Sequence, residues 1–332
     1  MSPGRELDGF AGLVAGLSGR EAGPAADNLV SNEDSYPRVA GELASAGLAG
    51  SVYLGVGPDQ NFSMIAACRP SWAFIVDRRR GNTLVHLLHK GLFTLADDRV
   101  GYLQRLTARA GLAVGAGATG SELVAAFSGP EMERGRLDRA ILDVAGVLRG
   151  LGVLAGRDEF EAVARIQARL AGPGMAARFL ALPMYPTLGR LIGTADRGGK
   201  PGHFLGTEAG YVTVRDLQRA DRCVPLVGDY SAADTLPRLA AWLRSRGLKV
   251  GVLYISDVEF FLLRAGQFKA YLANLSAMPW APGALIVRTS TREIGHPERV
   301  AGDSSTTIAR PVSAFLVEAH AGRIEAVDDL FR

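Results

Sequence analysis

The residues with the clearest chemical potential are two glycines and an acid that end two short apolar runs. Gly55 and Gly57 follow the first run, and Asp77 ends the second. Glycines in such a turn let the backbone approach a ligand, and an acid after the next strand can accept hydrogen bonds from ribose hydroxyls. The spacing predicts a strand–turn–helix–strand unit that holds a nucleoside. The alternative is an ordinary structural turn, because glycines also end strands that bind nothing.

The residues after the glycines indicate which nucleoside would bind. A dinucleotide fingerprint has a third glycine where this chain has Gln60, at the point where a helix meets a pyrophosphate. Asp59 would repel a pyrophosphate, but it suits a cation such as the α-ammonium of a methionine moiety. The turn therefore favours S-adenosylmethionine over NAD or FAD. Asp59, Gln60 and Asn61 are all expected to contact this cofactor.

The apolar runs alternate with helical patterns over most of the chain, which predicts a parallel sheet covered on both faces. Strands are expected at about 52–56, 73–76, 223–227, 250–255, 284–288 and 312–318. Ligands of such sheets bind beyond the carboxyl ends of the strands. The polar residues expected at those ends, besides Asp77, are Asp229, Tyr230, Ser256, Asp257, Thr289 and Ser290.

The predicted fold is a doubly wound, Rossmann-like α/β sheet with an N-terminal segment and a helical insertion. Residues 1–50 form the N-terminal helical and loop segment, and residues 51–96 form the first half of the Rossmann-like domain. Alternation breaks down over 97–220, where helical patterns and a glycine-rich stretch suggest an insertion that closes over the nucleotide domain as a lid. Residues 221–332 form the second half.

Bulk composition narrows the class of protein. The 332 residues are 48% apolar and carry a formal net charge of +3, which is too small to argue for nucleic acid. Two cysteines, Cys68 and Cys223, make no disulfide or zinc pattern and are expected to be buried. No apolar stretch is long enough to span a membrane. We expect a cytoplasmic protein acting on small molecules, and a homo-oligomer is left open.

Several motifs together resemble a known family. Tyr53–Gly57, Asp77, Asp229 and Ser256–Asp257 are similar to the motif series of class I S-adenosylmethionine-dependent methyltransferases. The resemblance implies that Gly55 and Gly57 flank the methionine part, Asp77 binds the ribose, Asp229 faces the adenine amine, and Ser256 and Asp257 lie near the sulfonium. A poorly characterised bacterial methyltransferase-like group is similar over 28–33, 56–62, 224–229 and 256–259. The Asp-Pro-Pro-Tyr or Asn-Pro-Pro-Tyr signature of amino-group methyltransferases is absent.

The same resemblance includes homologues that close a ring on the aminocarboxypropyl chain, giving products such as 1-aminocyclopropane-1-carboxylate. Either reaction needs a nucleophile held in line and water kept out. The candidate bases or catalytic residues are Glu33, Tyr36, His203, Glu208, Ser256 and Glu259.

Each of these candidates also has a structural alternative. Glu33 and Tyr36 could only pin the N-terminal loop, and Glu208 could be a helix-start carboxylate. His203 follows a glycine-rich loop and could lie on a mobile surface.

Two further features are weaker. Arg78, in the run Arg78–Arg80, is a candidate contact to a ligand carboxylate or ribose, or else begins a solvated helix. His86 and His89 have a spacing that can hold a metal, but no further ligands accompany them, so no metal is expected.

Three functions remain open. The first is methyl transfer to a small molecule in natural-product biosynthesis. The second is a cyclase or lyase reaction that consumes the cofactor alone and releases methylthioadenosine. The third is cofactor binding without catalysis.

Overall fold

A six-stranded sheet forms the centre of the fold, with the strand order β3-β2-β1-β4-β5-β6. The computed structural model describes residues 9–22, 28–115, 117–291 and 295–332. Five strands are parallel, and β6 is antiparallel to β5 at one edge. The strands are β1 Val52–Gly55, β2 Trp72–Asp77, β3 Cys223–Val227, β4 Val250–Ser256, β5 Trp280–Ser290 and β6 Thr306–Pro311.

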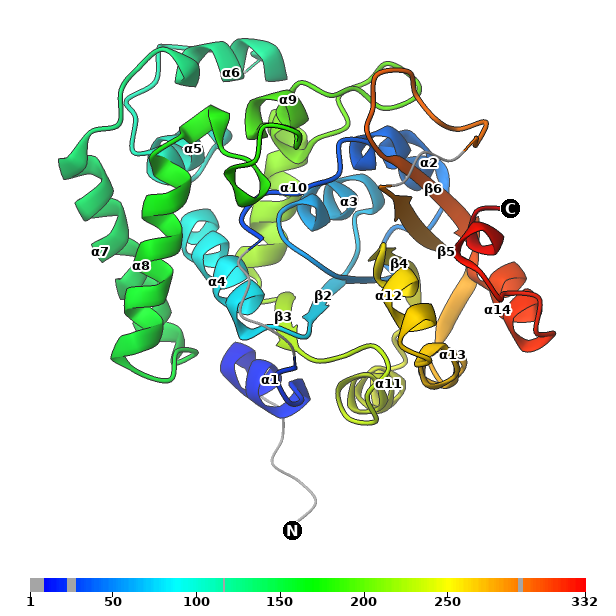
Figure 1. The fold of residues 1–332 in the computed structure, drawn as a ribbon. Helices are drawn as coiled ribbons and strands as arrows, with labels where there is room; N and C mark the ends of the chain where they lie inside the picture. Colours follow the sequence, from blue (N-terminus) through cyan, green and yellow to red (C-terminus); the bar gives the residue numbers. More distant parts are fainter. Residues whose placement is uncertain (1–8, 23–27, 116, 292–294) are drawn as a thin grey trace.

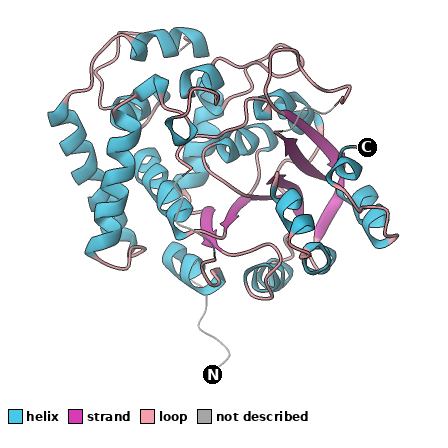
Figure 2. Ribbon diagram, in the orientation of Figure 1, coloured by secondary structure: helices cyan, strands magenta, loops and turns pink. Residues whose placement is uncertain are grey.

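Helices cover both sides of this sheet: α3 and α10 lie on one side, and α1 and α11 on the other (Figures 1 and 2). The α-helices are α1 Gly9–Leu17, α2 Ala40–Ser45, α3 Gln60–Cys68, α4 Arg80–Leu95, α5 Arg99–Thr107, α6 Gly120–Ser128, α7 Arg134–Leu151, α8 Arg157–Ala171, α9 Leu188–Ile192, α10 Glu208–Arg219, α11 Thr235–Ser245, α12 Val258–Arg264, α13 Phe268–Ser276 and α14 Val312–His320. Short 3₁₀ helices are η1 Tyr36–Val39, η2 Gly174–Ala176, η3 Phe179–Ala181, η4 Phe204–Gly206 and η5 Val327–Phe331.

The expected α/β architecture with a mostly parallel sheet is confirmed, and five of the six strands lie where they were predicted. The prediction of a strand at 312–318 is wrong, because this stretch lies in α14. Its buried residues are Val312, Phe315 and Ala319, spaced three and four apart as on one face of a helix. The last strand comes just before it and ends at Pro311, which suits an edge strand because proline lacks the amide hydrogen.

Helices α7 and α8, from the region between α4 and β3, lie beside the sheet, whereas α10 of the same region covers one of its faces. Helices α7 and α8 pack against α4, at the β3 side of the molecule (Figure 1). Gly91 of α4 allows this close approach, because a Cβ atom there would lie 2.9 Å from a Val144 methyl carbon. Within the described residues, no helix is both long enough and apolar enough to cross a membrane. Both cysteines are free and buried, as expected.

The N-terminal segment crosses the carboxyl ends of the strands. We call residues 18–22 and 28–36 the crossing segment; residues 23–27 lie outside the described part of the chain. Gly19 donates its backbone N–H to the carbonyl of Val227 at the end of β3. Ala22 donates to the carbonyl of Arg78, just after β2. The crossing segment therefore begins its path over the edge where α/β sheets bind their ligands.

The second part of the crossing segment reaches β1, β4 and β6. Ser31 donates its N–H to Asp59 Oδ1 beyond β1, at 3.0 Å. Ser35 Oγ lies 2.8 Å from Thr307 Oγ1 in β6. Between them, Asp34 accepts hydrogen bonds from the backbone N–H groups of Ser304 and Ser305. This carboxylate fastens the crossing segment to the loop before β6.

Candidate functional site

A buried acid from the crossing segment meets a second acid at the carboxyl end of β4. Glu33 is 1% exposed and accepts hydrogen bonds from Tyr254 Oη and Ser256 Oγ. Burial, followed by the charge of nearby Asp257, raises the pKa of Glu33 to about 7. Burial also raises the pKa of Asp257. A carboxyl group with a pKa near 7 can take or give a proton at neutral pH.

Ser256 is held in an uncommon backbone conformation. Its φ is +55°, in the left-handed region that residues other than glycine rarely adopt. Such strain costs roughly 1–3 kcal/mol and persists where surrounding contacts fix it. The turn places Ser256 Oγ against Glu33 and brings Asp257 to the same end of β4. The sequence prediction that Ser256 and Asp257 lie together at a strand end is confirmed.

A second buried acid, Asp59, lies just before α3. It accepts the Ser31 N–H, and burial raises its pKa to about 7. The next residue, Gln60, donates from Nε2 to Tyr254 Oη at 3.3 Å, and the same hydroxyl donates to Glu33. Within the described ranges, neither Asp59 nor Glu33 forms an ion pair with a basic side chain. These two acids therefore form a buried region that lacks a described positive charge.

The Gly55–Gly57 turn is closed by the protein's own side chains. A Cβ atom at Gly55 would lie 2.0 Å from Asn61 Oδ1 and 2.7 Å from the Tyr53 ring. Asn61 is itself fixed, because its Nδ2 donates to the carbonyls of 56, 57 and 58. Gly57 has a φ of +80°, and its nearest neighbour is Gln60 Nε2, the end of a flexible side chain. The face of Gly57 can therefore open by rotation of Gln60, whereas the face of Gly55 cannot.

This arrangement corrects the expectation for Asn61 and narrows the one for Gly55. Both were predicted to contact the cofactor. The Asn61 side chain instead bonds to Tyr53 and to backbone carbonyls, and the space on the Cβ side of Gly55 is occupied, so a contact from the rest of Gly55 stays a prediction. The carbonyl of Gly57 also accepts hydrogen bonds from Asn82 Nδ2 at 3.1 Å and contacts His86 Nε2 at 2.8 Å. These contacts stabilise the turn from beneath.

Asp77 lies at the end of β2, as predicted, and is 3% exposed. Both of its oxygens are bound by Arg79: Nε donates to Oδ1 at 2.9 Å and Nη2 to Oδ2 at 2.9 Å. The Arg79 N–H also donates to Oδ1. Since each carboxylate oxygen accepts about two hydrogen bonds, the contacts with Arg79 leave Oδ2 with the capacity for one further donor.

Arg78 does not reach the site. Its side chain is exposed, and Nε donates to the carbonyl of Ala22 at 2.8 Å, so it holds the crossing segment. The expectation that it contacts a ligand is corrected in favour of this role.

Asp229 and Tyr230 follow β3, as expected. Asp229 Oδ1 accepts from the N–H and the hydroxyl of Ser231, which is a local turn. Tyr230 Oη donates to the carbonyl of Gly55 at 2.9 Å, so this tyrosine closes the glycine turn rather than facing open space. The role of Asp229 toward an adenine remains a prediction, whereas Tyr230 is corrected to a residue that closes the turn.

Glu259 is not a free base. It is 2% exposed, and it forms a buried ion pair with Arg288, whose Nη2 lies 3.2 Å from Oε1. Tyr271 Oη donates to the same oxygen at 2.9 Å. A carboxylate held in this way stabilises the structure around β5 and α12, and removing either charge would leave the other buried alone.

Three other candidate bases are also corrected. Tyr36 is buried, and its pKa is raised well above its usual range by burial and by the charges of Asp59 and Glu33, so it stays protonated. His203 is buried rather than mobile, and burial lowers its pKa to about 3. Glu208 begins α10 and pairs with Arg99 at 3.2 Å, which is the structural alternative.

The histidine pair is also structural. His89 Nδ1 lies 2.7 Å from Tyr102 Oη, and burial lowers the pKa of both His86 and His89. The described part of the chain brings together no group of three or more metal-ligating side chains.

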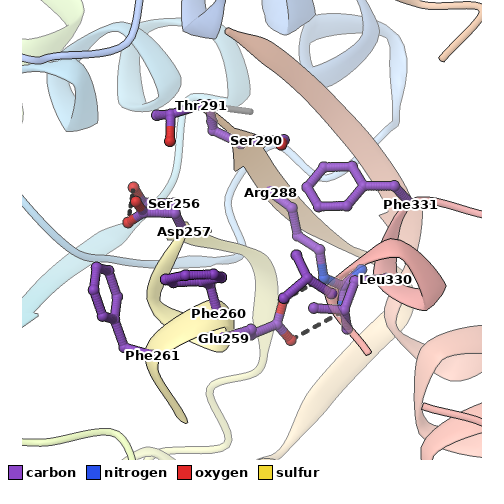
Figure 3. Close-up of a pocket in the computed structure, with 12 residues that line it drawn as sticks. Ser256, Asp257, Glu259, Phe260, Phe261, Arg288, Ser290, Thr291, Leu330 and Phe331 are labelled. Atoms are coloured by element: carbon purple, nitrogen blue, oxygen red, sulfur yellow. Dashed lines mark hydrogen bonds and ion pairs between the residues drawn. The ribbon is translucent and has the colours of Figure 1, made fainter. Parts of the chain in front are cut away.

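A cavity of about 130 Å³ opens beside Ser256 and Asp257 (Figure 3). Its wall is mainly apolar and aromatic, and it lies between α12 and the 3₁₀ helix η5. The residues that line it are Ser256, Asp257, Glu259, Phe260, Phe261, Arg288, Thr289, Ser290, Thr291, Val327, Leu330 and Phe331.

Sequence reasoning missed two parts of this site. Tyr254 links Glu33 to Gln60, but it lies inside an apolar run and reads as core. The aromatic wall comes from residues that follow β4 and from the last turn of the chain. A polar hydroxyl in the middle of a buried strand was the available signal for Tyr254, because buried hydroxyls need a partner.

Most of the site residues fall within a recognised sequence family, although Val327, Leu330 and Phe331 of the cavity wall lie beyond its matched ranges. A family described as "Domain of unknown function (DUF7790)" matches residues 28–115 and 181–320, which is more than half of the chain. The chain belongs to this family. A comparison with curated proteins finds no match.

The DUF7790 ranges contain Glu33, Asp59, Asp77 and Ser256–Asp257. Residues 116–180, which include α6, α7 and α8, fall between the two matched ranges. The acids and the sheet edge therefore belong to the region that the family shares. We call residues 116–180, with α6, α7 and α8, the helical flank, and it lies outside that region.

Proposed function

We propose that this protein is an enzyme that uses S-adenosylmethionine, with its reacting centre at Glu33, Ser256 and Asp257. The observation that carries the proposal is the pair of buried acids, Glu33 and Asp59, whose pKa values are both raised to about 7 in the absence of a described cation. A buried negative region of this kind gains most from a cationic ligand. The methionine end of the cofactor carries two positive groups, a sulfonium and an ammonium, against one carboxylate, so it is a net cation.

The fold supports the same placement. The order of the strands reverses between β1 and β4, and open α/β sheets bind ligands at such a point. Asp59 and Gln60 follow β1, and Ser256 and Asp257 end β4. We propose a methyltransferase-type Rossmann fold in which the methionine end of the cofactor lies between these two strands.

The residues fit the two ends of the cofactor unequally. Glu33 and Asp59 fit its cationic end. For the nucleoside end, Asp77 Oδ2 keeps one position for a ribose hydroxyl, and the face of Gly57 opens if Gln60 rotates. The side of Gly55 on which a Cβ atom would lie is filled by Asn61 and Tyr53, so no part of the cofactor is placed there.

The chemistry of the site is positioning and proton transfer. When bound, the cofactor would supply an electrophilic carbon with a neutral thioether as its leaving group. Glu33 accepts the proton that the nucleophile loses, and a pKa near 7 suits it to that role. Glu33 is almost completely buried, which keeps bulk water from the acid.

Product analysis distinguishes the two reactions that the site could support. Incubation with the cofactor alone should give methylthioadenosine and a small-ring amino acid if the protein is a cyclase. With an added acceptor, methyl transfer should give S-adenosylhomocysteine instead. For either reaction we expect Glu33→Gln to lower turnover by roughly 10²–10⁴-fold, the usual range for losing a general base.

A second candidate, cofactor binding without catalysis, is favoured by the ion pairs that occupy two of the predicted bases, Glu208 and Glu259. Tight binding of S-adenosylmethionine with no product, alone or with a panel of small amines and alcohols, would favour this function over an enzyme.

A further inference from the structure

We propose that the cavity beside Asp257 binds the acceptor molecule, and that this acceptor is a compact amine carrying one aromatic ring. The inference deepens the proposed function, and the role of the bound molecule as an acceptor rests on that function. The binding site itself is argued from the cavity, its wall and the charges around it.

The size of the cavity limits what can enter. A dry cavity of about 150 Å³ lined by leucine, isoleucine and phenylalanine holds benzene. The cavity here is of similar volume, about 130 Å³, and has an opening to solvent. It therefore admits one six-membered ring, and a second ring would lie outside.

The wall selects an apolar, flat group. Phe260 and Phe261 come from α12, and Leu330 and Phe331 face them from the 3₁₀ helix η5 (Figure 3). Phe261 is 56% exposed, so part of its ring is accessible to a ligand. Aromatic pairs in offset or edge-to-face arrangement add about 0.5–1.5 kcal/mol to the burial of a ring. An aromatic ligand would thus gain both from burial and from these contacts.

The charges around the cavity favour an amine over an acid. The positive charge of Arg288 is already paired with Glu259 and lies 4.3 Å from the Phe315 ring centre. Asp257 is half-buried, and no ion pair joins it to a basic residue in the described ranges. An ammonium group at this end of the cavity would meet a carboxylate, whereas an acid would meet repulsion.

An aromatic amine bound in this cavity would lie next to the proposed reacting centre. Asp257 adjoins Ser256, and Ser256 Oγ contacts Glu33. A ring held between α12 and η5 would direct its amine along this short chain of polar groups. The acceptor nitrogen would then lie at the end of β4, beside the group proposed to accept its proton.

The test uses benzylamine as the probe and needs no cofactor. Ligand-detected NMR should show benzylamine binding with a Kd of about 1 mM, as expected for so few atoms. Benzyl alcohol, which keeps the ring but lacks the charge, should bind about fivefold to tenfold more weakly. Methylamine, which has no ring, should not bind measurably. Equal binding of benzylamine and methylamine would overturn the proposal.

Variants locate the probe. Val327→Trp fills the cavity from η5, and Thr291→Trp covers its opening from an exposed position, so each should weaken benzylamine binding at least tenfold. Asp257→Asn should make benzylamine and benzyl alcohol bind equally. Leu142→Trp, at an exposed position of α7, is the matched control and should leave binding unchanged. Unchanged binding in the folded Thr291→Trp variant would overturn the site.

The outcome separates this inference from the proposed function. Benzylamine binding that responds to these variants, in a protein that never binds S-adenosylmethionine, would support the cavity and overturn the proposed function. Cofactor turnover in a protein that does not bind benzylamine would support the proposed function and overturn the acceptor site.

Discussion

Asp59 has a measurable consequence for stability because its pKa is raised from 3.8 to about 7 in the folded protein. The folded state then holds its proton more tightly than the unfolded state does. The resulting stabilisation is fully present below about pH 4 and is lost as the pH rises through 7. Asp59→Asn removes this dependence and should raise the free energy of unfolding at pH 8 by about 2–4 kcal/mol.

Urea unfolding at pH 4.5 and pH 8 measures this effect. The advantage of Asp59→Asn should shrink as the pH falls. Glu131→Gln, at an exposed acid, is the control and should change stability little at either pH. An Asp59→Asn variant that is no more stable than the wild type at pH 8 would contradict the account of an unpaired buried acid.

The closed glycine turn makes a second prediction. Gly55→Ala should destabilise the protein by about 1–3 kcal/mol, because the new methyl group meets Asn61 and Tyr53, which are both fixed. Gly146→Ala, inside α7 with no atom within 4 Å of the added Cβ, should stabilise it by about 0.5–1 kcal/mol. Thermal unfolding followed by circular dichroism compares the two. A stable Gly55→Ala variant would mean that the turn is open.

At the same scale, the sequence identified Glu33, Asp59 and Asp77 as chemically relevant, but not what surrounds them. The contact between Arg79 and Asp77 is local in sequence. The run Arg78–Arg80 nevertheless does not show which arginine side chain binds the Asp77 carboxylate. The partner of Glu33, Tyr254, lies 221 positions away, and only the folded chain brings them together. Roles that depend on such distant pairs could not be predicted.

Among the elements, the crossing segment depends on Asp34. This buried carboxylate accepts hydrogen bonds from the N–H and hydroxyl groups of Ser304 and Ser305. Asp34→Asn loses part of these bonds and the charge. Hydrogen exchange of amides 31–36 should therefore be at least about tenfold faster, which corresponds to about 1.4 kcal/mol of local stability.

Asp98→Asn serves as the control for this experiment. Asp98 caps α5 by accepting from the Gly101 N–H at 2.7 Å, so its loss should loosen α5 and leave amides 31–36 unchanged. Equal exchange in wild type and Asp34→Asn would show that the crossing segment is held by other contacts.

The elements also show what sequence patterns can predict. Short apolar runs bounded by glycine or polar residues located β1 to β4 closely, because buried parallel strands leave that signature. Residues 312–318 were misassigned because Val312, Phe315 and Val317 suit either a strand or a helix over so short a stretch. The position of the helical flank beside the sheet could not be predicted, since it depends on contacts between α7, α8 and α4.

Across the whole molecule, the helical flank and the sheet should unfold together, because α7 and α8 pack on α4. Trp72, Trp242 and Trp280 all lie in or against the sheet, whereas circular dichroism reports mainly on helices. Leu148→Ala, at a fully buried position of α7, should cost about 2–5 kcal/mol and shift both signals equally.

Leu142→Ala is the matched control on the same helix, at a residue that is 69% exposed. It should change neither signal by more than about 0.5 kcal/mol. Two separate transitions in Leu148→Ala, with fluorescence unaffected by the first, would show that the flank is an independent unit.

The central claim is that a cationic cofactor binds against Glu33 and Asp59, and calorimetry at pH 7 tests it most directly. With pKa values near 7, the two acids together hold about one proton, which a bound cation would displace. Titration of S-adenosylmethionine in phosphate and in Tris should therefore give different enthalpies, showing release of up to about one proton. Glu33→Gln and Asp59→Asn should each reduce that release. Absence of binding, or the same enthalpy in both buffers, would contradict the account.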